Sequence, residues 1–190
     1  MASSSAQTAH PLTERLIQHA REHPLDGPVI EVGSGSGRNT RALVDAGIPV
    51  VSVPDSTLYT QLPGLRDNYG AGLSTHAYLH GTSAKLRAGL AELRRVLMPG
   101  SPVFLTLGSI DDARYGLGAP LDERSFAPGD GEEAGIPHVY LDRDGVIEML
   151  FGFAITALDA VDVDAVVGTW AHGDDVLGGR VHWFVEARRQ

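Results

Sequence analysis

The stretch Val29-Ile30-Glu31-Val32-Gly33-Ser34-Gly35-Ser36-Gly37-Arg38-Asn39-Thr40 joins a short apolar run to three closely spaced glycines and then to a helix start. The run 28–32 has the length and composition of a buried strand. Glycine permits the positive φ of a tight turn, residues 39–46 can form a helix, and Gly47 can end it. A second apolar run, 49–53, follows directly. Strand, glycine turn, helix and strand form a βαβ unit, which predicts two parallel strands joined by a right-handed crossover.

The rest of the chain continues this alternation. Helices are predicted where apolar residues recur at helical spacing, and strands where short apolar runs are bounded by glycine, proline or polar residues. The helical segments are 11–23, 83–97 and 142–151, and the strands are 69–75, 102–107, 154–163 and 180–187. We therefore expect an α/β fold: a Rossmann-like, doubly wound, mostly parallel sheet with a C-terminal antiparallel hairpin. One domain would span residues 11–190, after a disordered N-terminus at residues 1–10.

Composition and charge exclude several classes of function. The 190 residues include no cysteine, which excludes a disulfide framework, thiolate zinc sites and a cysteine nucleophile. Residues 1–100 carry 9 Lys and Arg against 8 Asp and Glu, a balance of +1, whereas residues 101–190 carry 6 against 16, a balance of −10. Such an acidic half repels phosphates, so no nucleic-acid partner is expected. No segment has the apolar character of a membrane span or a signal peptide, so we expect a cytoplasmic protein with no membrane partner.

The turn from Gly33 to Gly37 is the expected ligand site. Ligands of open parallel sheets bind beyond the carboxyl ends of the strands, and the following helix directs unpaired N–H groups to the same place. A dinucleotide-binding turn has the pattern G-x-G-x-x-G, whereas this chain has G-x-G-x-G, with Glu31 two residues before the first glycine. That carboxylate disfavours an anionic pyrophosphate and suits a ligand with cationic ammonium and sulfonium groups. The residues thus favour S-adenosylmethionine over a nicotinamide dinucleotide.

Residues 29–40 also resemble motif I of the class I S-adenosylmethionine-dependent methyltransferases. The Gly-Arg-Asn-Thr ending is similar to a small-molecule branch that includes tellurite-resistance-type enzymes. Residues 93–100, Leu-Arg-Arg-Val-Leu-Met-Pro-Gly, are similar to the R-V-L-x-P-G-G turn of the same fold, and residues 73–81 resemble its fourth-strand motif. The resemblance covers residues 26–188. It implies methyl transfer to a small-molecule acceptor, with S-adenosylmethionine as cofactor.

The resemblance implies in turn which residues form the cofactor site. Those before and within the turn would line the methionine end, those at the start of the next helix would support the turn, and those at the end of the strand at 69–75 would lie near the sulfonium. In chain order these residues are Glu31, Gly33, Ser34, Gly35, Gly37, Asn39, Asp55, Ser74 and Thr75. Asp55 is included as the one acid that could hold the ribose hydroxyls, although it lies a residue late, after Pro54.

The segment after the second strand departs from the family pattern. Only residues 56–68 separate it from the strand at 69–75, and 13 residues cannot hold both a crossover helix and a strand. We therefore expect the usual third strand and its helix to be missing. The cofactor pocket would be open on one side, to be completed by the loop 58–65, by a second subunit or not at all. An unpaired edge strand also favours a homodimer.

The reacting groups are expected after the later strands of the parallel sheet. His76 is the candidate general base or substrate orienter. Residues 108–138 lack periodicity, which predicts an irregular lid or insertion. Its candidate residues are Asp111, Arg114, Tyr115, Glu132, Glu133, His138 and Tyr140, of which the first three follow the strand 102–107 most closely. His76 and His80 could share a helical face and bind a metal, but spacing fixes no third ligand, so no metal site is predicted.

Three alternative functions stay open. The missing third strand favours a protein that keeps the fold without methylating and serves as a binding partner. The glycine turn alone favours a nicotinamide oxidoreductase. An enzyme that binds the cofactor and catalyses a non-methyl reaction, such as a cyclisation, would share all the motifs above.

Overall fold

Four apolar segments form the parallel centre of the sheet: β1 (Val29–Val32), β2 (Val50–Val53), β3 (Ala71–Ser74) and β4 (Pro102–Ser109). The computed structural model describes residues 8–55, 61–131, 133–167 and 178–190. Within them, β1 pairs with β2 on one side and with β3 on the other, and β3 pairs with β4, all in parallel. The carboxyl ends of these strands therefore meet at one edge of the sheet.

An antiparallel hairpin completes the sheet beyond β4. It consists of β8 (Phe153–Asp162) and β9 (Val181–Arg189). β9 runs antiparallel along β4, from the pair Pro102 and Arg188 to the pair Gly108 and His182. This register brings the start of β9 to the carboxyl end of β4. The predicted α/β fold, with a parallel centre and a C-terminal hairpin, is confirmed.

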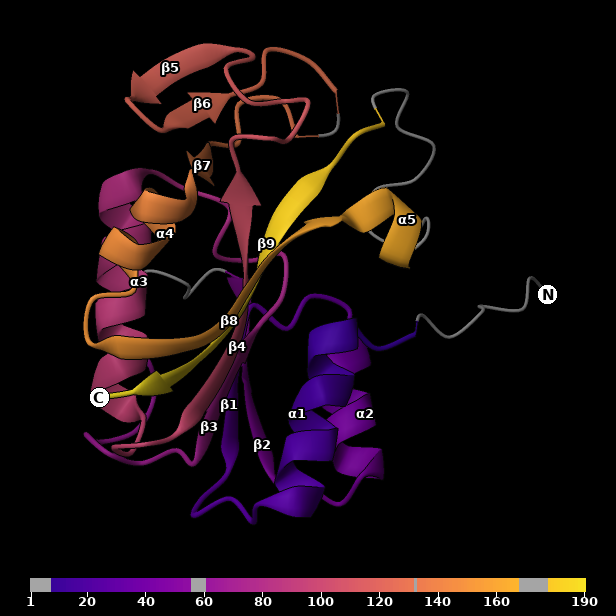
Figure 1. The fold of residues 1–190 in the computed structure, drawn as a ribbon, viewed down its shortest axis with the longest axis vertical. Coiled ribbons are helices and arrows are strands. Elements are labelled where there is room, and N and C mark those ends of the chain that lie inside the picture. Colours follow the sequence, from indigo (N-terminus) through magenta and orange to yellow (C-terminus); the bar gives the residue numbers. More distant parts are fainter. Residues whose placement is uncertain (1–7, 56–60, 132, 168–177) are drawn as a thin grey trace, which may run out of the picture.

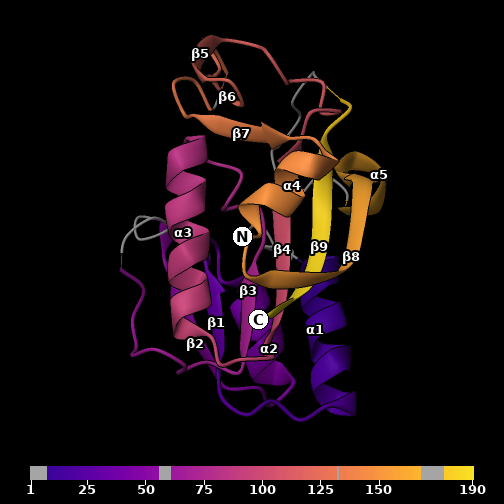
Figure 2. The ribbon, with the colours of Figure 1, turned by 60° about the vertical axis from the view of Figure 1, so that its left-hand side comes forward.

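In the described residues, α1 (Pro11–Glu22) and α2 (Arg38–Asp45) cover one face of the sheet, and α3 (Ser83–Val96) and α4 (Arg143–Met149) cover the other (Figures 1 and 2). A short helix, α5 (Val163–Val167), follows β8. Alternate residues of β1 enter the two apolar clusters: Val29 packs toward α1 and α2, while Ile30 and Val32 pack toward α3. The same alternation turns Glu31 toward α2.

The sheet ends at β2 on one side, because among the described residues β2 pairs with β1 alone. Between β2 and β3, residues 61–70 contain no helix or strand, and residues 58–60 of the predicted covering loop lie outside the described residues. Leu62 and Tyr69 from this segment are buried in the apolar cluster on the α3 side. The connection thus fills part of the core.

The sequence predicted an irregular segment at residues 108–138, but the structure has short strands there. These residues contain the hairpin of β5 (Ala119–Asp122) and β6 (Ser125–Ala127), and β6 pairs with β7 (His138–Leu141). This small unit stands above the main sheet (Figure 1) and joins it where β7 pairs with the last two residues of β4. β5 is exposed and β6 is mostly half-buried, so neither strand produces a recognisable apolar run in the sequence.

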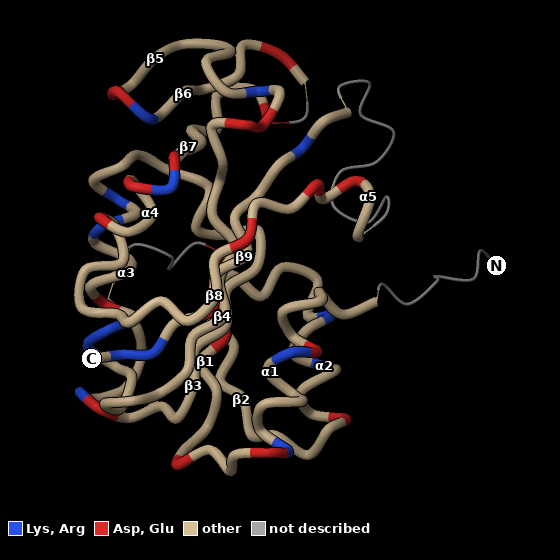
Figure 3. Tube along the Cα trace, in the orientation of Figure 1, with Lys and Arg blue, Asp and Glu red and all other residues tan. Residues whose placement is uncertain are grey.

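Acidic residues recur along the β5–β6 hairpin, the loop after β4 and α5, which together surround the carboxyl edge of the sheet (Figure 3). These segments carry five of the 16 Asp and Glu of residues 101–190, namely Asp111, Asp112, Asp122, Glu123 and Asp164, against two arginines, Arg114 and Arg124. An edge of this sign favours cationic over polyanionic ligands. Among the described helices, none combines the length and the hydropathy that crossing a membrane requires.

We predict that Gly108→Ala detaches β7 from β4. A Cβ at Gly108 would lie 2.3 Å from the carbonyl oxygen of Val139, a backbone atom that can yield only if the strands separate. The expected loss in the free energy of unfolding is about 1–3 kcal/mol, measured by urea denaturation. Gly129→Ala is the matched control, because nothing lies within 4 Å of its added Cβ. Equal unfolding midpoints for the two variants would contradict the close approach.

Candidate functional site

The glycine turn is fixed at its base and open at its tip. Gly33, Gly35 and Gly37 have φ of 79°, 47° and 73°, values that side chains other than glycine rarely adopt. The N–H groups of Gly33 and Ser34 both donate to the carbonyl of Val53 at the end of β2, at 2.8 and 3.1 Å. A Cβ at Gly35 would meet nothing within 4 Å. The backbone at the tip of the turn is therefore accessible from solvent.

Glu31 presents a buried carboxylate beside this turn. Its side chain belongs to a residue only 1% exposed. Oε2 accepts hydrogen bonds from the hydroxyls of Thr40 and Ser52, while Oε1 is buried and has no hydrogen-bond partner among the described residues. Burial raises the pKa of Glu31, and the hydroxyls of Thr40 and Ser52, the nearby amide of Asn39 and the charge of Arg38 oppose that rise. An unpaired buried carboxylate oxygen is costly, so it indicates a missing cationic or N–H partner.

Asn39, Ser74 and Thr75 bind one another and the backbone around the turn. The Asn39 amide donates to the Thr75 hydroxyl at 2.9 Å and accepts from the backbone N–H of His10 at 2.9 Å. The Ser74 hydroxyl donates to the carbonyl of Val32 at 2.8 Å. These predicted cofactor residues thus connect the ends of β1 and β3 with the starts of α1 and α2. They hold the shape of the site.

His76 lies at the centre of a cluster of imidazoles. It has φ of 57°, and its N–H donates to the hydroxyl of Thr106 on β4 at 2.6 Å. Its ring centroid lies 5.1 Å from that of His10 and 4.9 Å from that of His182. The sequence singled out His76 but neither neighbour. His10 belongs to the stretch expected to be disordered, yet it is buried and its Nδ1 caps α1.

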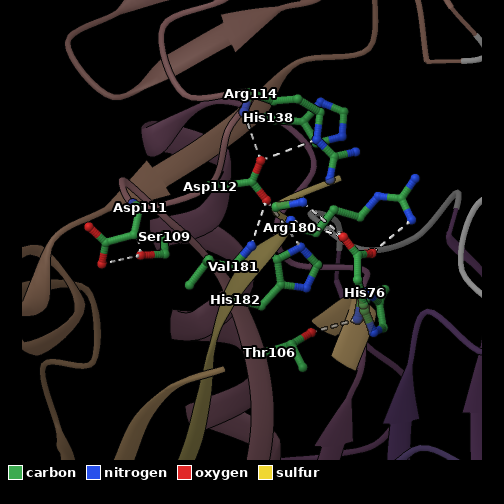
Figure 4. A network of polar contacts seen from close by, with 12 residues as sticks. His76, Thr106, Ser109, Asp111, Asp112, Arg114, His138, Arg180, Val181 and His182 are labelled. Atoms are coloured by element: carbon green, nitrogen blue, oxygen red, sulfur yellow. Dashed lines mark hydrogen bonds and ion pairs between the residues drawn. The ribbon is translucent and has the colours of Figure 1, made fainter. Parts of the chain in front are cut away.

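Asp112 is a buried carboxylate that the sequence analysis missed in favour of Asp111 (Figure 4). It accepts hydrogen bonds from the N–H and Nε of Arg114, at 2.9 and 3.2 Å, and from the N–H of Val181 at 3.1 Å. Its Oδ2 also lies 3.9 Å from Nε2 of His182. Asp111 is exposed and pairs with Ser109. Contacts therefore run from His76 through His182 and Asp112 to Arg114.

Tyr115 belongs to an aromatic group on the β5–β7 unit. Its ring meets those of Phe126 and Tyr140 edge-on, with centroids 5.6 and 5.7 Å away. Burial raises the pKa of Tyr140 to about 12. Between this group and the Asp112 network lies a cavity of about 20 Å³, enough for one water molecule. Polar residues lining it include Asp112, Arg114, Glu133, His138, Tyr140 and His182.

Of the two remaining predicted site residues, the structure describes only Asp55. Asp55 is exposed, one residue beyond Pro54, and forms the end of the described segment after β2. Glu132 lies outside the described residues.

Comparisons with known proteins bear on the fold. No protein-family model matches the sequence, and no curated protein matches it. A solved S-adenosylmethionine-dependent methyltransferase from Methanosarcina mazei superposes with a TM-score of 0.66 at 14% identity, over 96% of this chain and 98% of that one. The 1,6-didemethyltoxoflavin-N1-methyltransferase of Burkholderia thailandensis gives 0.63 at 17% identity, over 95% and 77%. The cyclase SpnF gives 0.55 at 17% identity, over 93% and 81%. The chain therefore has the Rossmann-like fold of methyltransferases.

We predict that the neutral ring of His10 makes stability depend on pH. Burial, then the charges of Arg38, His182 and Arg15, lower its pKa from 6.5 to about 3. Below pH 6.5 the imidazole of His10 binds a proton in the unfolded chain but stays neutral in the folded chain. The free energy of unfolding therefore decreases as the pH is lowered from 6.5 toward 3.

The variant that tests this is His10→Asn, because asparagine keeps a capping oxygen for α1 and removes the titrating ring. When the pH is lowered from 7.5 to 5, the free energy of unfolding should decrease in both proteins. We expect the decrease to be smaller in the variant than in the unmodified protein, by up to about 2 kcal/mol. Urea denaturation at the two pH values gives the comparison. Equal losses would show that the folded protein protonates this ring.

Proposed function

We propose that this protein binds S-adenosylmethionine at the glycine turn and transfers its methyl group to a small-molecule acceptor. The observation that carries the proposal is the buried Oε1 of Glu31, which lacks a partner beside an accessible turn. A cationic amine would supply that partner. The acidic residues around the carboxyl edge of the sheet also favour a cationic ligand (Figure 3).

The residues of the turn fit this cofactor better than a dinucleotide. A pyrophosphate would bring negative charge toward Glu31 and add to the cost of its burial. In the proposed complex, Glu31, Gly33, Ser34 and Gly35 bind the methionine end, while Gly37 lets α2 begin directly below it. Asn39, Ser74 and Thr75 keep the ends of β1 and β3 in place. The cofactor, when bound, supplies an electrophilic methyl group on a sulfonium.

The chain's own part in the reaction is to orient the acceptor and exclude water. His76 is the proposed base or orienting group, since its backbone is fixed by Thr106 and its ring is packed between two further imidazoles. Arg114 and Tyr115, on the loop after β4, are proposed to face the acceptor, with Asp111 at the exposed rim.

A small acceptor is favoured over a nucleic acid, because the acidic edge would repel a polyanion. Among proteins of similar structure, the Burkholderia enzyme was solved with 1,6-didemethyltoxoflavin and S-adenosylhomocysteine bound, which is a small acceptor with the demethylated cofactor.

A second candidate is a protein of this fold that does not methylate. The observation that favours it is the edge position of β2 among the described residues, together with the exposure of Asp55. At the β2 edge of the sheet, the adenosine of a bound cofactor would be less enclosed by protein. The similarity to SpnF shows that a cyclase can have this architecture. The product's mass separates the two, because only methyl transfer adds a methyl group.

We predict that Glu31→Gln weakens binding of S-adenosylhomocysteine at least tenfold, which corresponds to about 1.4 kcal/mol. The substitution removes the charge and keeps the shape and an oxygen for Thr40 and Ser52. Isothermal titration with the purified protein measures the effect. Asp111→Ala is the control, because that carboxylate is exposed at the same edge, and its affinity should stay within about twofold of the unmodified protein.

Folding of the Glu31→Gln variant provides the internal check. Because burial raises the pKa of Glu31, the folded state is destabilised by ionisation as the pH rises above the unfolded value of 4.5. The variant should therefore melt no lower than the unmodified protein at pH 7.5, so that a loss of binding reports on the site. Absence of S-adenosylhomocysteine binding to the unmodified protein, or equal effects of the two substitutions, would overturn the proposal.

A further inference from the structure

Three potential metal ligands converge beside the loop that follows β3. Nε2 of His80 lies 3.4 Å from Oε1 of Glu133, and Nε2 of His138 lies 3.2 Å from Oε2 of the same carboxylate. Single ligand atoms from the three residues all lie within 4.8 Å of one another. Their side chains are 28%, 21% and 9% exposed, respectively, so the cluster is partly enclosed and still reachable from solvent.

The backbone holds two of these ligands in register. Residues 79–81 run antiparallel to residues 137–139, with His80 directly opposite His138. The N–H of Val139 donates to the carbonyl of Leu79 at 2.8 Å, and the N–H of Gly81 donates to the carbonyl of Pro137 at 2.7 Å. The two imidazoles are thus preorganised by main-chain hydrogen bonds, and their ring centroids lie 4.8 Å apart.

His138 presents the nitrogen that a metal requires. Its Nδ1 lies 2.9 Å from the carbonyl oxygen of Ile136. Because a carbonyl oxygen only accepts hydrogen bonds, Nδ1 of the neutral ring carries the proton and Nε2 offers its lone pair toward Glu133. Metal-bound histidines commonly have such a second hydrogen bond, which fixes the tautomer and the orientation of the ring.

We propose that His80, Glu133 and His138 form a binding site for a zinc ion or a similar divalent transition metal. Two ligands that are each about 2.1 Å from zinc, at a tetrahedral angle, lie about 3.4 Å apart. The separations of 3.2 and 3.4 Å, one to each oxygen of Glu133, are close to that value, and one ligand atom from each residue lies within 4.8 Å of the others. Two imidazoles and a carboxylate suit zinc, whereas calcium and magnesium prefer oxygen ligands throughout. Three protein ligands leave a fourth position for water or another oxygen donor.

The site differs from the pair that the sequence suggested. His76 packs between His10 and His182 and is not among the three ligands. His80 instead joins Glu133, which lies 53 residues later in the chain, and His138. The pairing of residues 79–81 with residues 137–139 brings these distant parts of the chain together. A bound ion would connect the segment between β6 and β7 to the loop after β3. It would stabilise the closed arrangement of the β5–β7 unit over the sheet.

The experiment uses the full chain without a polyhistidine tag, freed of metal with a chelator and dialysed, in the absence of S-adenosylmethionine. Titration with zinc against a chromophoric competitor should show one ion per chain and a dissociation constant below about 1 μM. Glu133→Gln and His80→Ala should each weaken binding at least tenfold. The double variant His19→Ala/His23→Ala is the matched control, because those rings also lie close together, with centroids 5.0 Å apart, in the last turn of α1 and directly after it.

A cobalt titration of the unmodified chain keeps the test independent of how the variants fold. Four-coordinate cobalt with imidazole ligands absorbs strongly in the visible range, and that band should saturate at one equivalent and disappear when zinc is added. Saturable zinc binding that both ligand variants lose and the control keeps would support the site. Absence of saturable binding, survival of binding in the ligand variants, or its loss in the control would overturn it. Neither result depends on whether the protein methylates.

Discussion

The parallel pairing of β1 with β2 and β3 is the constraint on which the site depends. Because these strands run in one direction, their carboxyl ends share an edge, and residues distant in the sequence meet there (Figure 2). Glu31 lies near the end of β1, Thr75 follows β3, and Asp112 follows β4, which pairs in parallel with β3. The antiparallel register of β9 then adds His182 to the same edge. If one of these strands ran in the opposite direction, its residues of the site would lie at the other edge of the sheet.

Two buried carboxylates at this edge are treated differently by their surroundings. Asp112 accepts three hydrogen bonds and faces the guanidinium of Arg114, so its charge is compensated within the chain. Glu31 has hydroxyl donors on one oxygen and none on the other. A satisfied buried charge serves structure, whereas an unsatisfied one is destabilising unless a ligand completes it. Asp112 therefore supports the structure of the site, whereas Glu31 is the residue expected to bind a ligand.

Periodic burial explains which elements could be predicted. The strands and helices that pack against the two apolar clusters were predicted to within two or three residues, because one face of each carries the apolar residues. The exceptions are the β5–β6 hairpin, whose residues are mostly exposed or half-buried, and β7, which is buried but directly follows a stretch rich in glycine and proline. His10 was misjudged for a related reason: a single buried ring that caps a helix leaves no periodic signal.

The sequence by itself determined the fold class, the position of the glycine turn and the acid before it, because these follow from local backbone requirements and from short-range apolar spacing. Tertiary structure alone decided which polar residues meet. The choice of Asp112 over the adjacent Asp111 depends on the direction in which the chain turns after β4 and on the N–H of Val181, 69 residues later. The convergence of His80 with Glu133 and His138 likewise depends on long-range backbone pairing, which no local pattern encodes.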